Sequence, residues 1–336
     1  MRTGTWQQAI GNSKKHQLLR FVLCALLVAL CASAEAQQAK RVPRIAFLAG
    51  GSRAADALLL QAFWQRMKDL GYVEGKNIVA EYRFAEGAPE RLANFAAELV
   101  HLNVDVIVAP GSGARAAKKV TDTVPIVMTY GDPLGDGLVA SLARPGGNVT
   151  GLSGFVSELG GKQLELLKEV FPQISRIAVL WWTSPNALML QDMKLAAGAV
   201  RVNLQPIELH DAHDFDPAFA AIRKERAEAV IALRNPLTAT YRTRIVDFAA
   251  KSRLPVIYPD REFVDAGGLM SYGVSIPDLW GQAAAYVDKI LKGAKPADLP
   301  VEQPTKFEFI INLKAAKQLG LTIPPNVLVR ADKIIK

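Results

Sequence analysis

The sequence predicts an α/β protein with two lobes, each built on a sheet of parallel strands. Short runs rich in β-branched residues alternate with longer amphipathic stretches from Arg44 onward, and this order is typical of parallel sheets covered by helices on both faces. A glycine-rich break at residues 144–151 interrupts the order, and a similar set of strands and helices then begins. Such a break between similar halves indicates a crossing from one lobe to the other.

In the first half, short apolar runs predict four strands and apolar residues at helical spacing predict four helices. The first helix is expected to stop at the glycine of the Asp-Leu-Gly-Tyr sequence at residues 69–72. The predicted strands are residues 44–48, 77–84, 104–109 and 125–130. The predicted helices are residues 56–70, 90–102, 115–120 and 134–143.

The second half repeats this alternation with five strands and five helices, by the same criteria. The predicted strands are residues 176–181, 202–209, 229–233, 255–258 and 269–272. The predicted helices are residues 161–170, 186–200, 215–226, 237–252 and 278–291.

Two later breaks predict further crossings between the lobes. One is the pair Gly267-Gly268, and the other is the proline-bounded segment 300–304. A body of this kind hinges, and it encloses a ligand in the cleft between its lobes. We assign the lobes as residues 43–149 plus 270–303 for the N-terminal lobe, and residues 150–269 plus 304–336 for the C-terminal lobe.

The first 36 residues predict export to the periplasm. A leader with basic residues precedes an uninterrupted apolar run at residues 21–30, and the sequence Ala-Glu-Ala at 34–36 suits signal peptidase. We therefore expect residues 1–36 to be a signal peptide cleaved near Ala36. The apolar run is shorter than the ~20 residues that a bilayer requires, so the mature protein is not expected to span a membrane. Retention of the leader as an anchor is the alternative.

The composition of the remaining chain excludes several classes of function. Both cysteines, Cys24 and Cys31, lie in the leader, so an exported chain has no disulfide, thiol nucleophile or thiolate metal site. Neither cysteine follows a small residue, as a lipid-attachment site would require. The formal net charge is +8, but basic and acidic residues are interspersed, whereas a nucleic-acid partner requires a basic face. We expect no nucleic-acid partner.

The loops that follow the predicted strands are the places where a ligand is expected. In parallel α/β sheets, ligands gather outside the carboxyl ends of the strands, beside helix N-termini. Glycine, aromatic and polar residues follow several strands here. The candidates for ligand binding in these loops are Gly51, Ser52, Ser112, Gly113, Thr129, Tyr130, Asp132, Trp182, Asn235 and Asp260.

Residues 111–116 fit the dinucleotide pattern G-x-G-x-x-A, and Asp132 follows at about the expected spacing. The pattern follows the third predicted strand rather than the first, and an exported protein has little access to dinucleotides, so we expect no cofactor. The glycines would expose backbone N–H groups that suit a ligand carboxylate, with Ser112 adding its hydroxyl. The alternative is a tight turn without a ligand.

Other candidates are also open to two interpretations. Asp132 would either receive a ligand ammonium group or cap a helix that begins at Leu134. Of Trp181 and Trp182, strand alternation places one in the core and the other where it would stack on an apolar ligand group. Tyr130 has the same two possible roles.

The sequence contains no motif that argues for an enzyme or a metal site. His210 and His213 have the spacing H-x-x-H, but they fall in a polar loop with too few neighbouring ligands for a metal. A nucleophile elbow, a P-loop and a carboxylate pair placed for hydrolysis are absent from the sequence. We therefore expect a protein that is not an enzyme.

Several sequence runs resemble those of the ABC transporter substrate-binding family that includes the tryptophan/tyrosine-binding lipoproteins. The longest runs are Asp-Pro-Leu-Gly-Asp-Gly-Leu-Val at 132–139 and Ser-Leu-Ala-Arg-Pro-Gly-Gly-Asn-Val-Thr-Gly at 141–151. The resemblance implies a type I periplasmic binding protein fold, with two Rossmann-like lobes and three interlobe crossovers. Further matching runs are residues 267–273, 304–308, 312–317 and 320–325.

This resemblance implies a periplasmic solute-binding receptor that delivers a small solute to the transmembrane permease subunits of an ABC importer. The solute would be an amino acid, with an aromatic one expected, or an aromatic carboxylate. A sensory module acting on a membrane receptor or kinase is the alternative. The residues implied to meet an amino-acid head group from the first lobe are Ser112, Thr129 and Asp132. Those implied from the second lobe are Trp182, Asn186, Asn235 and Asp260.

Two features depart from the family pattern. Relatives from Gram-positive bacteria are lipid-anchored, whereas this chain lacks a good lipid-attachment context. Arg234 places a cation beside Asn235, where a plain amino-acid site does not obviously need one. Arg234 would instead suit a carboxylate or an aromatic acid.

Overall fold

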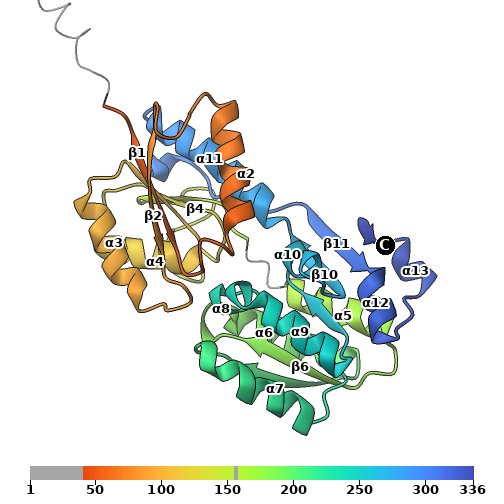
Figure 1. The fold of residues 1–336 in the computed structure, drawn as a ribbon. Helices are drawn as coiled ribbons and strands as arrows, with labels where there is room; N and C mark the ends of the chain where they lie inside the picture. Colours follow the sequence, from red (N-terminus) through yellow and green to blue (C-terminus); the bar gives the residue numbers. More distant parts are fainter. Residues whose placement is uncertain (1–40, 155–157) are drawn as a thin grey trace, which may run out of the picture. The chain divides into compact units, whose positions relative to one another are not determined.

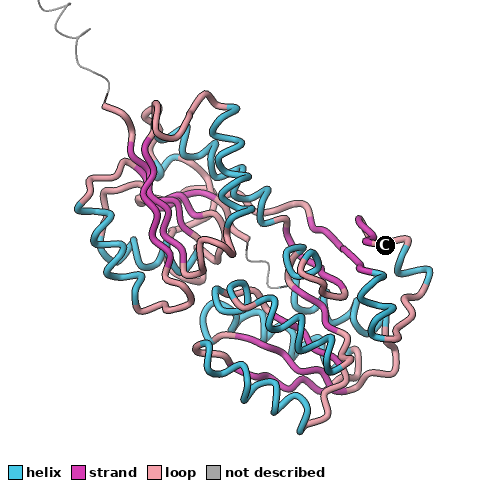
Figure 2. Tube along the Cα trace, in the orientation of Figure 1, coloured by secondary structure: helices cyan, strands magenta, loops and turns pink. Residues whose placement is uncertain are grey.

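The structure is a computed structural model that describes residues 41–154 and 158–336, without the side chains of Glu158 and residues 183–186. The predicted signal peptide lies outside the described residues. Within Pro43–Lys336, the strands form two separate sheets, as predicted (Figures 1 and 2). The described residues contain no helix long and apolar enough to cross a membrane.

The first sheet forms the N-terminal lobe and is parallel throughout, with strand order β2-β1-β3-β4-β5. Helices α2 and α11 pack against each other on one side of this sheet, and α3 and α4 lie on the other (Figure 1). The strands are β1 (Arg44–Ala49), β2 (Val79–Phe84), β3 (Val106–Ala109), β4 (Ile126–Met128) and β5 (Val149–Gly151). The helices are α2 (Ala57–Asp69), α3 (Arg91–His101), α4 (Gly111–Val120) and α11 (Ile276–Leu291).

The second sheet forms the C-terminal lobe and has the order β12-β11-β10-β9-β8-β6-β7. Among its described strands, β10 and β11 pair antiparallel and the other neighbours are parallel. The strands are β6 (Arg176–Trp181), β7 (Asn203–Glu208), β8 (Ala229–Ala232), β9 (Val256–Tyr258), β10 (Met270–Val274), β11 (Phe307–Asn312) and β12 (Lys333–Ile335). The helices are α5 (Glu158–Val170), α6 (Thr183–Ala199), α7 (Phe215–Lys224), α8 (Pro236–Thr240), α9 (Arg242–Ser252), α10 (Arg261–Asp265), α12 (Leu313–Leu319) and α13 (Pro325–Leu328), with 3-10 turns at η1 (Ala212–Asp214) and, before β11, η2 (Pro296–Asp298).

An aromatic cluster holds α11 on the first sheet although this helix comes late in the sequence. The ring of Trp280 on α11 stacks on Phe47 of β1 with a centroid distance of 6.1 Å, and Phe63 of α2 meets Phe47 edge-on at 5.0 Å. All three side chains are almost completely buried. Offset and edge-on aromatic pairs add to the stability that burial alone provides, so this cluster fixes the return of the chain to the first lobe.

The chain crosses between the sheets after β5, after β10 and after η2, but two crossings differ from the boundaries assigned from the sequence. Strand β5 extends the first sheet to Gly151, beyond the expected boundary at 149. Strand β10 pairs with β9 and β11, so the second crossing follows Val274 instead of preceding Met270. The pair Gly267-Gly268 instead makes the turn between α10 and β10, where Gly267 has φ +105°.

The helix predicted over residues 134–143 is wrong, because this segment is a series of turns. Gly137 has φ +66°, a conformation that interrupts a helix, and the Asp132 carboxylate accepts a hydrogen bond from the N–H of Gly135. The helix predicted over 237–252 is divided into α8 and α9 at Tyr241. Strands β5, β11 and β12 were not predicted.

We predict that Gly113→Ala destabilises the protein, because a Cβ atom at this position in α4 would lie 2.1 Å from the carbonyl oxygen of Leu48. Overpacking of this kind typically costs ~1–3 kcal/mol, measurable as the free energy of unfolding in urea. Gly147→Ala is the control, because its added Cβ would meet no atom within 4 Å. Equal stability of the two variants would contradict the prediction.

Candidate functional site

A small pocket of about 80 Å³ lies where loops from both sheets meet. The loops follow β1, β3 and β4 in the first sheet and β8 in the second, all at the carboxyl ends of the strands. This is where α/β proteins bind ligands. The lining residues are Gly50, Gly51, Asp56, Pro110, Gly111, Ser112, Arg115, Tyr130, Gly131, Asp136, Arg234, Asn235, Pro236 and Ala239.

The N-terminus of α4 forms one wall of this strand-end pocket. Pro110 precedes the helix in an extended conformation and provides no side-chain cap. The loops after β3 and β4 approach closely here, because a Cβ on Gly131 would lie 2.9 Å from the α-carbon of Gly111. The first N–H groups of a helix lack intrahelical acceptors, so this wall presents donors and partial positive charge beside the half-buried Ser112.

An ion pair flanks this wall. Arg115 Nη1 lies 2.5 Å from Asp136 Oδ2, and the two side chains are 24% and 11% exposed. Burial raises the pKa of Asp136, although Arg115 opposes this shift. The Arg115 and Asp136 charges therefore lie at the pocket and neutralise each other.

The opposite wall carries a second, more deeply buried ion pair between Arg234 and Asp260. Burial alone would lower the pKa of Arg234, but Asp260, Glu262 and Tyr130 together raise it. The Arg234 guanidinium carbon also lies 5.9 Å from the centre of the Tyr130 ring, at the outer limit of a cation–π contact. Burial raises the pKa of Tyr130 to about 12, so this contact joins a cation of the second lobe to a neutral phenol of the first.

Helix α8 of the second lobe approaches the glycine-containing loops of the first. Asn235 caps the helix by accepting a hydrogen bond from the N–H of Thr238. A Cβ on Gly50 would lie 3.1 Å from the Pro236 side chain, so the two lobes come close together here. The resulting pocket is smaller than the ~300–1,000 Å³ typical of small-molecule sites. A solute of amino-acid size would therefore enter only if the walls separate.

Asp56 is a buried carboxylate in this pocket, with 7% of its surface exposed. It occupies the N-cap position of α2 but makes no capping hydrogen bond. Burial raises the pKa of Asp56 to about 6, while Arg234 and Arg242 lower it and Glu86 raises it. Asp56 therefore carries an energetic cost in the ionised state that its surroundings only partly offset.

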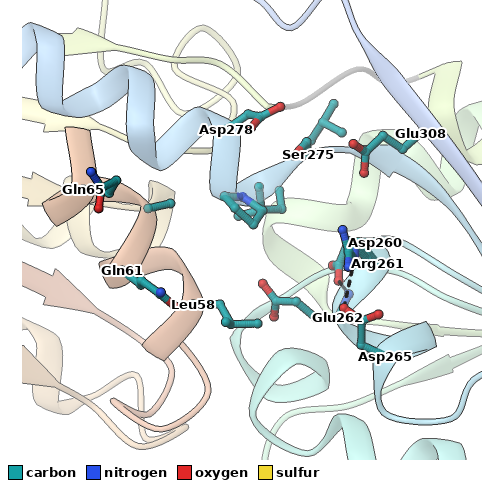
Figure 3. Close-up of a pocket in the computed structure, with 14 residues that line it drawn as sticks. Leu58, Gln61, Gln65, Asp260, Arg261, Glu262, Asp265, Ser275, Asp278 and Glu308 are labelled. Carbon is teal, nitrogen blue, oxygen red and sulfur yellow. Dashed lines mark hydrogen bonds and ion pairs between the residues drawn. The ribbon is translucent and has the colours of Figure 1, made fainter. Parts of the chain in front are cut away.

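A second and larger pocket of about 490 Å³ lies beside α2, α10 and the link between β10 and α11. Figure 3 shows Gln61 and Gln65 on one side and Glu262 and Asp265 on the other. Glu262 Oε1 is buried without a hydrogen-bond partner among the described residues, and burial raises the pKa of Glu262 to about 7. This pocket is lined by helix flanks and the interlobe link more than by strand-end loops, so the strand-end pocket is the candidate solute site despite its smaller volume.

Four of the residues expected from the sequence line the strand-end pocket: Gly51, Ser112, Tyr130 and Asn235. Asp260 lines the larger pocket and caps α10 by accepting from the N–H of Glu262. The predicted residues therefore divide between these two cavities and other places in the fold.

The remaining expected residues lie outside the strand-end pocket. The Ser52 hydroxyl accepts from the N–H of Ala55, and Asp132 caps a turn. Thr129 is completely buried, and Trp182 is half-buried immediately before α6. Gly113 packs on Leu48 as described above, and the side chain of Asn186 lies outside the described part of the structure.

Three charged residues of the pocket were not expected from the sequence: Asp56, Arg115 and Asp136. Asp136 lay inside a predicted helix, and Arg115 was assigned to the start of another. Asp56 was placed at a predicted helix start, where an aspartate usually serves as a cap. The sequence did not indicate that the Asp56 carboxylate lines a pocket instead of capping the helix.

Comparison with known proteins places the chain among solute-binding proteins. The family model described as ABC transporter substrate binding protein matches residues 45–335. The tyrosine-binding protein of Clostridioides difficile strain R20291 is 28% identical over 265 residues, which are 78% of this chain and 76% of that protein.

Two solved structures resemble the chain over most of its length. A conserved domain protein from Vibrio cholerae is 32% identical with a TM-score of 0.81, covering 88% of this chain and all of that one. A Streptococcus pneumoniae ABC domain in complex with L-Trp is 26% identical with a TM-score of 0.81, covering 87% of this chain and 99% of that one. The leucine-binding protein LivK of Thermotoga maritima, 14% identical with a TM-score of 0.52 over 76% of this chain and 78% of that one, shares the fold.

We predict that Asp56→Asn stabilises the unliganded protein at alkaline pH. The folded-state pKa of about 6 exceeds the reference value of 3.8, so ionisation destabilises the folded state as the pH rises from about 4 to above 6. At pH 8, the shift corresponds to ~3 kcal/mol of unfolding free energy at 1.36 kcal/mol per pH unit. Urea unfolding at several pH values measures the difference.

The advantage of Asp56→Asn should shrink toward pH 4, where Asp56 is protonated in the folded state and partly protonated in the unfolded state. Asp69→Asn is the matched control, because Asp69 is exposed at the other end of α2. An advantage of Asp56→Asn that is equal at pH 4 and pH 8 would contradict the prediction.

Proposed function

Because the chain belongs to the ABC transporter substrate-binding protein family, we propose that it is the periplasmic solute receptor of an ABC importer. The observation that carries this proposal is the strand-end pocket, which draws its walls from both sheets. The receptor would hold its solute in this pocket and present it to the permease. No step of this function breaks a bond in the solute.

The proposed solute is an amino acid, with an aromatic one favoured, or an aromatic carboxylate. The C. difficile relative is named a tyrosine-binding protein, and the S. pneumoniae relative was solved with L-Trp. In this chain, the N-terminus of α4 and the Ser112 hydroxyl suit a carboxylate, and Tyr130 offers an aromatic surface. These features support a planar, anionic or zwitterionic solute.

Binding would proceed by hinge closure. The solute would first contact one lobe while the walls are apart, and the approach of α8 to the loop after β1 would then complete the pocket. The close approach of Pro236 to Gly50 supports this view, and the pocket of about 80 Å³ is smaller than a typical small-molecule site. The closed form is the one that would dock on the transmembrane permease subunits.

Export would precede this function. We propose that residues 1–36 act as a signal peptide cleaved near Ala36 and that the mature protein works in the periplasm. Substrate-binding proteins act outside the cytoplasmic membrane, which supports this location. Mass spectrometry of the protein recovered from a periplasmic extract would detect the new N-terminus.

We predict that the purified protein binds at least one member of a panel of aromatic amino acids and aromatic carboxylates, measured by isothermal titration calorimetry. Ser112→Ala should weaken that binding ~10-fold or more, since a hydrogen bond to a charged group is worth ~1.5–3 kcal/mol. Ser252→Ala is the control, because Ser252 ends α9 and lines neither pocket. Mass spectrometry should recover the solute unchanged. Absence of binding across the panel would refute the proposed solute class.

A further inference from the structure

We propose that the strand-end pocket binds a protonated amine of its solute, held by Asp56 of the first lobe and Thr240 of the second beside Gly51. This inference rests on the proposed function and narrows it. Of the two solute classes considered, it selects the amino acid over the aromatic carboxylate.

The first observation is that Asp56 does not do what an aspartate at its position usually does. An aspartate or asparagine at the N-cap normally accepts a hydrogen bond from the first turn of its own helix. Asp260 does so at α10, and Asn312 does so at α12. Asp56 makes no such bond. Its carboxylate lines the pocket instead and has no hydrogen bond or ion pair with the described residues.

The second observation is a convergence of oxygen atoms from the two lobes. A Cβ built on Gly51 would lie 3.6 Å from both carboxylate oxygens of Asp56 and 3.6 Å from Thr240 Oγ1. Thr240 Oγ1 is buried and has no hydrogen-bond partner among the described residues. Three acceptor oxygens therefore face one small space, which the absence of a side chain at Gly51 leaves open.

The chemistry of this space matches an ammonium group. An ammonium is a compact cation with three N–H donors, whereas a guanidinium is a planar fork that requires a wider site. A ligand carboxylate would be repelled by Asp56. A bound ammonium would supply the hydrogen bonds that the carboxylate and hydroxyl lack, and it would remove the cost of a buried charge.

The cations near Asp56 do not take this place. Arg234 forms its ion pair with Asp260, and Arg242 donates a hydrogen bond to the carbonyl oxygen of Ala239. Both act on the Asp56 carboxylate electrostatically, while Glu86 adds negative potential. The N-terminus of α4 lies on another wall of the same pocket, so an amino acid would find donors for its carboxylate and acceptors for its amine.

The first test changes the ligand. Calorimetry would compare L-tyrosine with 3-(4-hydroxyphenyl)propionate, which lacks the amine, and L-tryptophan with indole-3-propionate. We expect the loss of the amine to weaken binding ~10- to 100-fold or more, as expected for a charge-assisted hydrogen-bonded group. Equal or tighter binding of the amine-free acids would overturn the inference and leave the solute-receptor function intact.

The second test changes the protein. Asp56→Asn should weaken amino-acid binding ~10- to 100-fold. Binding of the amine-free acids should not weaken, and it should strengthen where the Asp56 charge repels their carboxylate. Thr240→Val should weaken amino-acid binding by a smaller factor, ~3- to 10-fold, since it removes one neutral acceptor. Asp69→Asn and Thr243→Val are matched controls at exposed positions.

Gly51→Ala provides a steric version of the same test. Its added Cβ would make ordinary 3.6 Å contacts, so folding should be retained, and the methyl group would occupy the space proposed for the amine. We expect loss of amino-acid binding with an unchanged unfolding midpoint. Wild-type affinity for L-tyrosine or L-tryptophan in both Gly51→Ala and Asp56→Asn would overturn the inference. Failure of the wild-type protein to bind any of the four compounds would overturn the proposed aromatic solute class together with it.

Discussion

The packing of Trp280 on Phe47, which Phe63 meets edge-on, is the interaction on which the two-lobe arrangement depends. It anchors α11, from the last quarter of the chain, on a sheet whose strands all come from the first half. Burial of Trp280 against β1 stabilises the position of α11 on the first sheet, so it favours the crossing that follows β10. The later crossing to β11 and the extra strands of the second sheet depend on this return. The loops that form the strand-end pocket are therefore held in place by the hydrophobic cores of the lobes.

Within the part of the chain that the structure describes, the buried charges at the strand-end pocket are of two kinds: some are paired with an opposite charge, and one is not. Arg234 with Asp260, and Arg115 with Asp136, are paired within their own lobes, so their desolvation is partly repaid by mutual attraction. Asp56 is not paired in this way among the described residues. A protein selected only for stability would cap α2 with this residue or replace it, and sites that sacrifice stability are commonly functional. The unfavourable environment of Asp56 is thus the feature that distinguishes the pocket from a mere junction between loops.

Much of the architecture could be predicted from the sequence because it follows from local periodicity. The buried run that became β6 and the amphipathic segment that became α11 were both recognisable, as was the glycine-rich break near β5. The segment at 134–143 misled the prediction because its apolar spacing imitates a helix, whereas Gly137 adopts a left-handed conformation. Strand β12 has three residues and is stabilised by pairing with β11, which no local pattern reveals. Four residues expected from the loops line the strand-end pocket, but the orientation of the Asp56 side chain is a tertiary property. A sequence can show that an aspartate precedes a helix, but it cannot show that the carboxylate turns away from it.

The second crossing is unusually short, because Ser275 alone separates the end of β10 from the start of α11. A strand in one lobe and a helix in the other are thus joined by the backbone torsion angles of about one residue, and any swing of the lobes must pivot close to it. Ser275 also borders the larger of the two pockets. That cavity therefore lies beside the shortest of the three crossings between the sheets. Any rotation of one lobe against the other would have to be accommodated by the backbone torsion angles around Ser275, as well as by the two longer crossings.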